Sequence, residues 1–147
     1  MEWLVQLSNN KILISSVFAW MLAQILKTLI NFLSTKEFNP ERLFGSGGMP
    51  SSHSSTVCAL VTAVAIQYGF DTYEFAMAAV FAIIVMYDAM NVRREAGKHA
   101  KWINIITTTL QPDIPFESKF KEYLGHTPLQ VLMGAFLGIA TAFMMMQ

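Results

Sequence analysis

The chain has few charged residues and almost no cysteine. Asp, Glu, Lys and Arg make up 14% of its 147 residues, whereas about a quarter of an ordinary soluble domain is charged. A single cysteine, Cys58, excludes an internal disulfide. Ten basic residues balance ten acidic ones, so the chain lacks the basic excess of a nucleic-acid-binding domain. These shortages argue against a disulfide scaffold and a nucleic-acid partner, and they indicate a membrane protein.

Hydrophobic residues, at 54% of the chain, gather in four long stretches. A transmembrane helix needs about 20 apolar residues, and roughly 17 are enough. We therefore predict an all-α integral membrane bundle of about four transmembrane helices, in a single domain over residues 1–147. The predicted spans lie near residues 12–33, 52–70, 73–90 and 128–146.

Small residues recur four positions apart within three of these spans. The pairs are Ala19/Ala23, Ala59/Ala63 and Gly134/Gly138. This spacing lets neighbouring helices approach closely, so it supports a packed bundle.

The segment between the last two spans, residues 91–127, is more polar and carries two apolar stripes separated by the breaker "QPDIP". We predict two short helices that lie in the membrane interface. A small cytosolic cap that packs on itself is the alternative. The first stripe is Trp102, Ile105 and Ile106, and the second is Phe116, Phe120 and Leu124.

Four spans bring the polar motifs of the first and third connections to one face of the membrane. Most Lys and Arg residues belong to this face, and Lys11 is the only basic residue opposite. Since basic residues concentrate on the cytoplasmic side, we expect a bacterial cell-membrane protein whose motif face is cytoplasmic. Arginines recruited to bind phosphate would bias the same count.

Two polar stretches on this face run directly into predicted helices. "GGMPSSHSS", residues 47–55, offers Ser51 or Ser52 as an N-cap, and "LGHTPLQ", residues 124–130, offers Thr127 before a proline. Helix N-termini attract anions, and glycines such as Gly48 let the backbone come close to one.

Arginine side chains complete this pattern. Arg42, Arg93 and Arg94 lie on the same predicted face, and guanidinium groups grip phosphate oxygens in a bidentate way. Two helix N-termini, each with a histidine, together with these arginines predict a phosphate site. The sequence shows no acidic or histidine cluster with metal-ligand spacing, so we expect no metal and no cofactor.

"GGMPSSHSS", "YDAMNVRREAGKHA" and "LGHTPLQVLMG" together resemble the divergent branch of the type 2 phosphatidic acid phosphatase superfamily, which is related to acid phosphatases and vanadium haloperoxidases. The resemblance implies a membrane helical bundle with a metal-independent phosphatase site. It also implies that one histidine attacks phosphorus to form a phosphohistidine, while a second histidine protonates the leaving group. Lysine and arginine side chains would hold the phosphate oxygens.

By this resemblance, His126 is the nucleophile and His53 the general acid, with Ser52 where the family often has glycine. The family commonly has an aspartate four residues after the nucleophile, where this chain has Gln130. A neutral amide can fix the imidazole tautomer but stabilises an imidazolium less than a carboxylate does. Asp88, near the end of the third span, could supply the missing charge.

Several of these residues have alternative interpretations. Arg93 and His99 have the arginine-to-histidine spacing of the family, but no transmembrane helix begins after His99, so we favour His126. Lys27, on roughly one face with Gln24 and Asn31, binds phosphate or snorkels to the interface. Asp88 could equally form a structural ion pair with one of the neighbouring arginines.

We therefore expect a membrane-embedded phosphatase that hydrolyses a lipid phosphate monoester or diphosphate through a phosphohistidine intermediate. Phosphatidylglycerol phosphate, phosphatidic acid and polyprenyl diphosphate are compatible substrates, and the bilayer is the expected partner; a homo-oligomer is compatible too. The alternatives are a catalytically impaired lipid- or phosphate-binding membrane protein, kept open by Gln130, and a small membrane partner subunit.

Overall fold

The computed structural model describes residues 1–37, 48–110, 120, 122 and 125–147, and these residues form helices and connections with no strand. The predicted all-α fold is thus confirmed. The helices are α1 (Glu2–Ser8), α2 (Lys11–Thr35), α3 (Ser52–Tyr68), α4 (Tyr73–Met90), α5 (Val92–Leu110) and α6 (Pro128–Met145).

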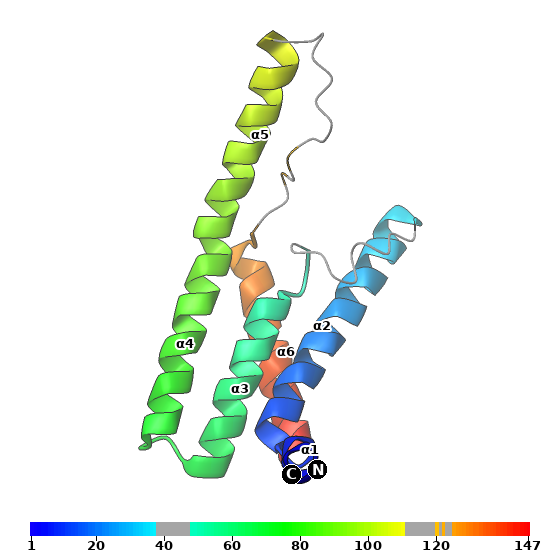
Figure 1. Ribbon diagram of the computed structural model, residues 1–147. Helices are drawn as coiled ribbons and strands as arrows, with labels where there is room; N and C mark the ends of the chain where they lie inside the picture. The colour runs from blue at the N-terminus through cyan, green and yellow to red at the C-terminus, as the bar shows by residue number, and fades with distance from the viewer. Residues whose placement is uncertain (38–47, 111–119, 121, 123–124) are drawn as a thin grey trace.

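Helix α3 occupies the middle of the bundle, where it packs against α2, α4 and α6 (Figure 1). Helix α2, the α4–α5 column and α6 are long and apolar enough to cross a membrane. Helix α3 is only 17 residues long and packs alongside the other three. This arrangement agrees with the expectation of about four spans.

Small residues bring α3 and α6 into close contact. A Cβ atom added at Gly134 would collide with the carbonyl oxygen of Ser51, and one added at Gly138 would collide with that of Ser55. The buried Ala59 and Ala63 of α3 pack in one cluster with Ala19 of α2 and Ala142 of α6. The close helix approach predicted from the small-residue pairs is therefore confirmed.

The outer surface of the bundle is apolar. On α4 the side chains of Phe81, Ile83 and Ile84 are 51%, 63% and 60% exposed, while the small Ala78 and Ala82 face inwards. Large exposed hydrophobic residues over a whole helix face are typical of a surface that lipid covers. The bundle is therefore built as an integral membrane protein.

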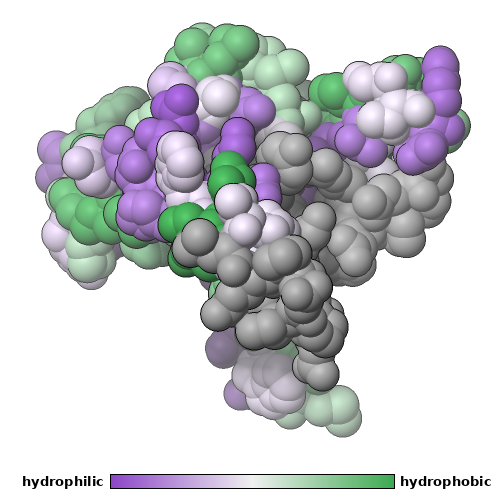
Figure 2. Space-filling model, turned by 90° about the horizontal axis from the view of Figure 1, so that it is seen from above, coloured by the Kyte–Doolittle hydropathy of each residue, from purple (hydrophilic) through white to green (hydrophobic). Residues whose placement is uncertain are grey.

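One end of the bundle collects the polar motifs, as the predicted threading requires. The C-terminus of α2, the N-terminus of α3, the junction of α4 with α5 and the N-terminus of α6 all lie at this end, which is the upper end in Figure 1. Both chain termini lie at the opposite end. The view from above in Figure 2 shows hydrophilic residues gathered on the motif end, with hydrophobic ones among them.

Helix α5 differs from the short interfacial helix that the sequence predicts. It has 19 residues and continues the line of α4 beyond Asn91, away from the bundle (Figure 1). Trp102, Ile105 and Ile106 are exposed on it, at 64%, 41% and 52%. No proline or glycine stands at the junction to turn the chain, and this explains the longer column.

The returning chain crosses α5 at Asn104, which is buried. Its side-chain amide donates to the carbonyl of Phe120 and to the carboxylate of Glu122, and its oxygen accepts from the backbone N–H of Phe120. Apart from Phe120, the predicted second stripe lies outside the described residues.

Candidate active site

His126 is held at the junction of α4 and α5 by its own backbone. Its N–H donates to the carbonyl of Ala89, at 2.9 Å. The preceding Gly125 has a φ of +87°, and a Cβ there would collide with the backbone of Arg93 and Arg94. Only glycine tolerates both conditions. The loop before α6 is therefore pressed against the first turn of α5, with the His126 side chain 2% exposed.

Gln130 determines which nitrogen of His126 carries the proton. The backbone N–H of Thr127 donates to Gln130 Oε1 at 3.1 Å, which identifies that atom as the amide oxygen. His126 Nδ1 lies 3.2 Å from the same oxygen. Because an amide oxygen only accepts hydrogen bonds, Nδ1 must be the donor, and the Nε2 atom of neutral His126 keeps its lone pair.

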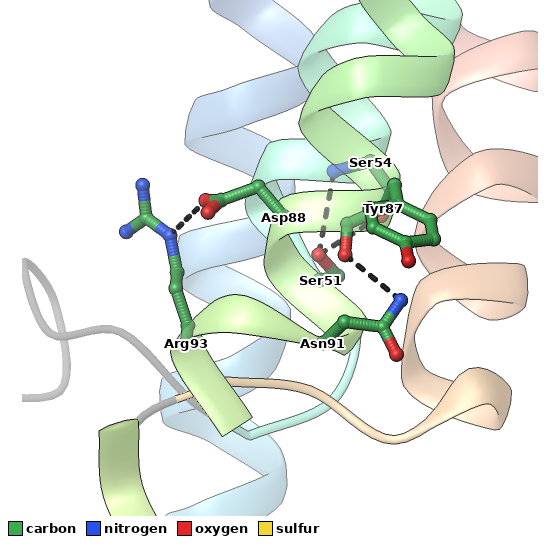
Figure 3. Close-up of polar contacts among 6 residues, drawn as sticks. All are labelled: Ser51, Ser54, Tyr87, Asp88, Asn91 and Arg93. Carbon is green, nitrogen blue, oxygen red and sulfur yellow. Dashed lines mark hydrogen bonds and ion pairs between the residues drawn. The ribbon is translucent and has the colours of Figure 1, made fainter. Parts of the chain in front are cut away.

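The N-terminus of α3 is fixed against α6 in a similar way. Ser51 is the N-cap, as predicted, and its hydroxyl accepts from the backbone N–H and the hydroxyl of Ser54 (Figure 3). The backbone N–H of Ser51 donates to the carbonyl of Gln130, at 3.0 Å. Ser52 begins α3 and is also buried. This packing sets His53, in the first turn of α3, beside the start of α6.

The predicted cap of α6 is also confirmed. The Thr127 hydroxyl accepts from the backbone N–H of Gln130, and Pro128 occupies the first turn. The reciprocal bond from Thr127 N–H to Gln130 completes a capping box.

The two histidine rings face each other across the site. Their centroids are 5.8 Å apart, with an angle of 64° between the ring planes. His53 Nδ1 and His126 Nε2 are both buried and have no hydrogen-bond partner within the described part of the chain. Buried polar atoms normally find a partner, so two such nitrogens on neighbouring rings indicate a place for a polar ligand.

Lys27 brings a positive charge to this place from α2. Its side chain is 2% exposed, its Nζ donates to Gln24 Oε1 at 2.6 Å, and its stem lies against Gly48. It is close enough to act electrostatically on both histidines. Burial inside the bundle argues against snorkelling, which would leave the ammonium group in water.

Asp88 and Arg93 form an ion pair beside the histidines, with 2.6 Å between the Asp88 Oδ2 and Arg93 Nε atoms (Figure 3). The alternative interpretation of Asp88 as an ion-pair partner is thus observed, and Gln130 is the side chain that contacts His126. Arg93 lies within electrostatic range of both rings, and its remaining guanidinium donors can serve an anion.

The other predicted residues are placed less directly. Arg94 and His99 are exposed on α5, and Arg94 meets the site through its backbone at Gly125. Arg42 lies outside the described residues. Within the described parts of the chain, no three His, Cys, Asp or Glu side chains group closely enough to hold a metal ion.

The environment of His126 favours its neutral form. Burial is the main influence and lowers the pKa of His126 below its ordinary 6.5, while the Gln130 hydrogen bond opposes this shift and nearby Lys27 adds to it. The nearby Gly48 backbone also raises the pKa of His126, although its Nε2 forms no hydrogen bond within the described residues. At neutral pH the Nε2 lone pair is therefore available.

Comparison with known proteins gives a family match. The divergent PAP2 family matches residues 8–141. The chain belongs to that family. It is also 39% identical, over 92% of its length, to an uncharacterized membrane protein, YuiD, of Bacillus subtilis (strain 168), of which the match covers 93%. No solved structure is a significant match to this divergent PAP2 protein. The resemblance read from the three motifs is confirmed.

Three features that build the site were not predicted. The Ala89 carbonyl is a backbone group and leaves no trace in sequence. Gly125 and Ser54, in contrast, stand inside the two quoted motifs, and a glycine directly before a histidine at a helix start is a detectable signal for a strained turn.

Substitutions at Gln130 test its role in holding the tautomer. Gln130→Leu removes the acceptor for His126 Nδ1, and we expect turnover to fall on the order of 100-fold, the scale of one well-placed catalytic group. Gln130→Glu keeps an acceptor oxygen and should retain or exceed the original rate. The measurement is kcat/KM for a lipid phosphate; equal rates for both variants would show that Gln130 does not position His126.

Proposed function

We propose that this protein is a membrane-embedded, metal-independent phosphatase that hydrolyses a lipid phosphate monoester or diphosphate. The observation that carries the proposal is a pair of buried, unpartnered nitrogens, Nε2 of His126 and Nδ1 of His53, on rings whose centroids are 5.8 Å apart. A phosphoryl group placed between these nitrogens meets a nucleophile on one side and a proton donor on the other.

In the first step the Nε2 lone pair of His126 attacks phosphorus, and the bond from phosphorus to the lipid oxygen breaks. His53 gives its proton to that departing oxygen. In the second step His53 takes a proton from water, the water oxygen attacks phosphorus, and the P–N bond breaks. Inorganic phosphate leaves, His126 is restored, and His53 again holds its proton for the next turnover.

Charge on the phosphoryl oxygens is neutralised by the groups around the two histidines. Lys27 and Arg93 lie within electrostatic range, and the first turn of α3 contributes its helix N-terminus. Preorganised cations and N–H groups stabilise the transition state without reorganising. The two negative charges of a bound monoester also favour a protonated imidazole beside them, which suits His53 as the acid.

The position of the site in the bundle supports a lipid substrate. The histidines lie at the polar end of helices whose outer faces are apolar, so head groups reach them by diffusion within the membrane. We also propose that this end faces the cytoplasm, on the basic-residue count. Cysteine at Thr109, in a Cys58-free variant, should then resist an impermeant thiol reagent in intact cells, while one at Asp71 should react.

The pH dependence should report the lowered pKa of His126. The lone pair is lost as pH falls through that pKa, so we expect the midpoint of the acidic decline in kcat/KM to lie below the ordinary value of 6.5. Lys27→Met removes a nearby positive charge, which should raise the pKa of His126 and move the acidic limb to higher pH. If the acidic decline of kcat/KM occurs at the same pH in Lys27→Met, the pH profile does not report the titration of His126.

A direct test of the proposal uses the purified protein in detergent with a panel of lipid phosphates and EDTA. We expect inorganic phosphate to be released, and added magnesium to be unnecessary. Binding of the same lipids without release would favour the catalytically impaired alternative. Activity that EDTA abolishes and magnesium restores would contradict the mechanism.

A further inference from the structure

A long groove runs along α3 from the level just below the two histidines towards the opposite end of the bundle. It is a cavity of about 700 Å³ between α2, α3 and α4, which falls within the ~300–1,000 Å³ of typical ligand pockets. Its walls include Leu13, Val17, Thr56, Leu60, Gln67 and Phe81.

The groove and His53 share one face of α3. Positions three, four and seven residues apart lie on the same side of a helix, so Thr56, Val57 and Leu60 follow His53 down that face. Thr56 is one turn away, whereas Gln67 lies about 21 Å along the axis, at 1.5 Å per residue. The groove therefore begins beside the proposed phosphate position and follows the helix across the membrane layer.

The chemistry of the walls changes along the groove. Leu13, Val17, Leu60 and Phe81 give its middle an apolar lining, and Val17 and Phe81 remain 46% and 51% exposed. It is thus open sideways to the layer in which lipid tails lie. Polar side chains line its far end, near the α3–α4 turn: Asn9, Asn10, Lys11 and Gln67.

We propose that this groove holds a hydrocarbon chain of the substrate while its phosphate lies between His53 and His126. The inference rests on the proposed function. A phosphate bound at the histidines fixes the head of the lipid, and the attached chain must then run from His53 into the apolar layer. The groove is the apolar path that begins on the same face, and the polar far end limits the length of chain that it can take.

A second cavity beside α3 differs from the groove in its position relative to His53. It measures about 360 Å³ and is lined by Val61, Ile66, Phe70, Ile139 and Phe143 among others. Its lining is more apolar than that of the groove, but it lies on the side of α3 that includes Ile66, away from the His53 face. A chain leaving the histidines does not reach it without crossing α3.

A groove-filling substitution and a matched control test the proposal. Leu60→Trp places an indole in the groove, and Ile66→Trp makes the same kind of change on the same helix in the second cavity. For each variant, kcat/KM is measured for long-chain phosphatidic acid, for a polyprenyl diphosphate and for water-soluble phenyl phosphate. We expect Leu60→Trp to lower the ratio of lipid to phenyl phosphate kcat/KM at least about tenfold, and Ile66→Trp to leave it unchanged.

The outcomes separate this inference from the proposed function. A larger loss for one of the two lipids identifies the chain, acyl or prenyl, that the groove accepts. An unchanged ratio in Leu60→Trp, or an equal loss in Ile66→Trp, would contradict the proposal that the groove holds the lipid chain. Neither result would contradict the proposed phosphatase activity. An original protein that hydrolyses none of the three substrates would instead overturn the proposed function.

Discussion

Replacement of His126 by alanine should abolish turnover. In the proposed mechanism this side chain supplies the attacking Nε2, and among the described side chains the one other unpartnered, buried nitrogen belongs to His53 on the neighbouring ring. Loss of a catalytic nucleophile removes the covalent route, so we expect kcat to fall at least about 10⁴-fold. The measurement is phosphate release from a lipid phosphate in detergent, with protein folding checked by the thermal transition.

His99→Ala is the matched control, because His99 is exposed on α5. It should keep its activity. Since alanine at a buried position could also weaken packing, partial recovery of His126→Ala by added imidazole provides a second readout. An active His126→Ala together with an inactive His99→Ala would reverse the assignment of the nucleophile.

Replacement of His53 by alanine should slow hydrolysis by an amount that depends on the leaving group. General acid catalysis contributes about 10²- to 10⁴-fold, and an alkoxide such as a lipid oxygen needs the proton most. We expect a loss in that range for a lipid phosphate monoester. An aryl phosphate, whose leaving oxygen departs without a proton, should be affected far less. The measurement is kcat for both substrates.

This comparison distinguishes acid catalysis from a structural role. His53 is half-buried in the first turn of α3, so its removal could also disturb the helix start, but such damage would slow both substrates equally. Ser52→Gly restores the residue that the family often has there and should remain active. Equal losses of kcat for both substrates would show that His53 is not the general acid.

The bounds of α3, α4 and α6 follow closely from the sequence, because long apolar runs there end at clear signals. Ser51 and Thr127 cap two of these helices, and Gly69 with a φ of +93° ends α3. Local capping chemistry depends only on neighbouring residues, so it can be read without a fold. Gly134 and Gly138 predicted that α6 approaches a neighbouring helix closely, but only the structure shows that this neighbour is α3.

The course of α5 shows what periodicity leaves open. An apolar stripe containing Trp102 and Ile106 indicates a helix, but the stripe alone does not set the angle between that helix and the one before it. The angle depends on the backbone conformation between Met90 and Val92. Here Asn91 stays in the right-handed helical region, so α5 continues the line of α4 (Figure 1). The amphipathic pattern therefore predicted a helix correctly but did not predict its direction.

The site shows the same division between local and tertiary information. The roles of His53 and His126 rest on motifs, and the structure brings both rings together. From the sequence, Gln130 is expected to stabilise an imidazolium less than the usual aspartate does. The position of the Thr127 N–H then shows that the amide oxygen of Gln130 faces the imidazole. The approach of Lys27 to both rings depends on how α2 packs on α3, and no spacing along the chain predicts it.

The central claim is that phosphate is transferred to Nε2 of His126, and detection of that intermediate tests it most directly. The purified protein is mixed with a lipid phosphate, quenched under alkaline conditions that preserve phosphohistidine, digested and analysed by mass spectrometry with fragmentation. We expect a phosphoryl group on the peptide that contains His126, formed without divalent metal and absent from His126→Ala. Turnover with no phosphorylated His126 peptide at any quench time, or with the phosphoryl group on His53 or His99, would contradict the account.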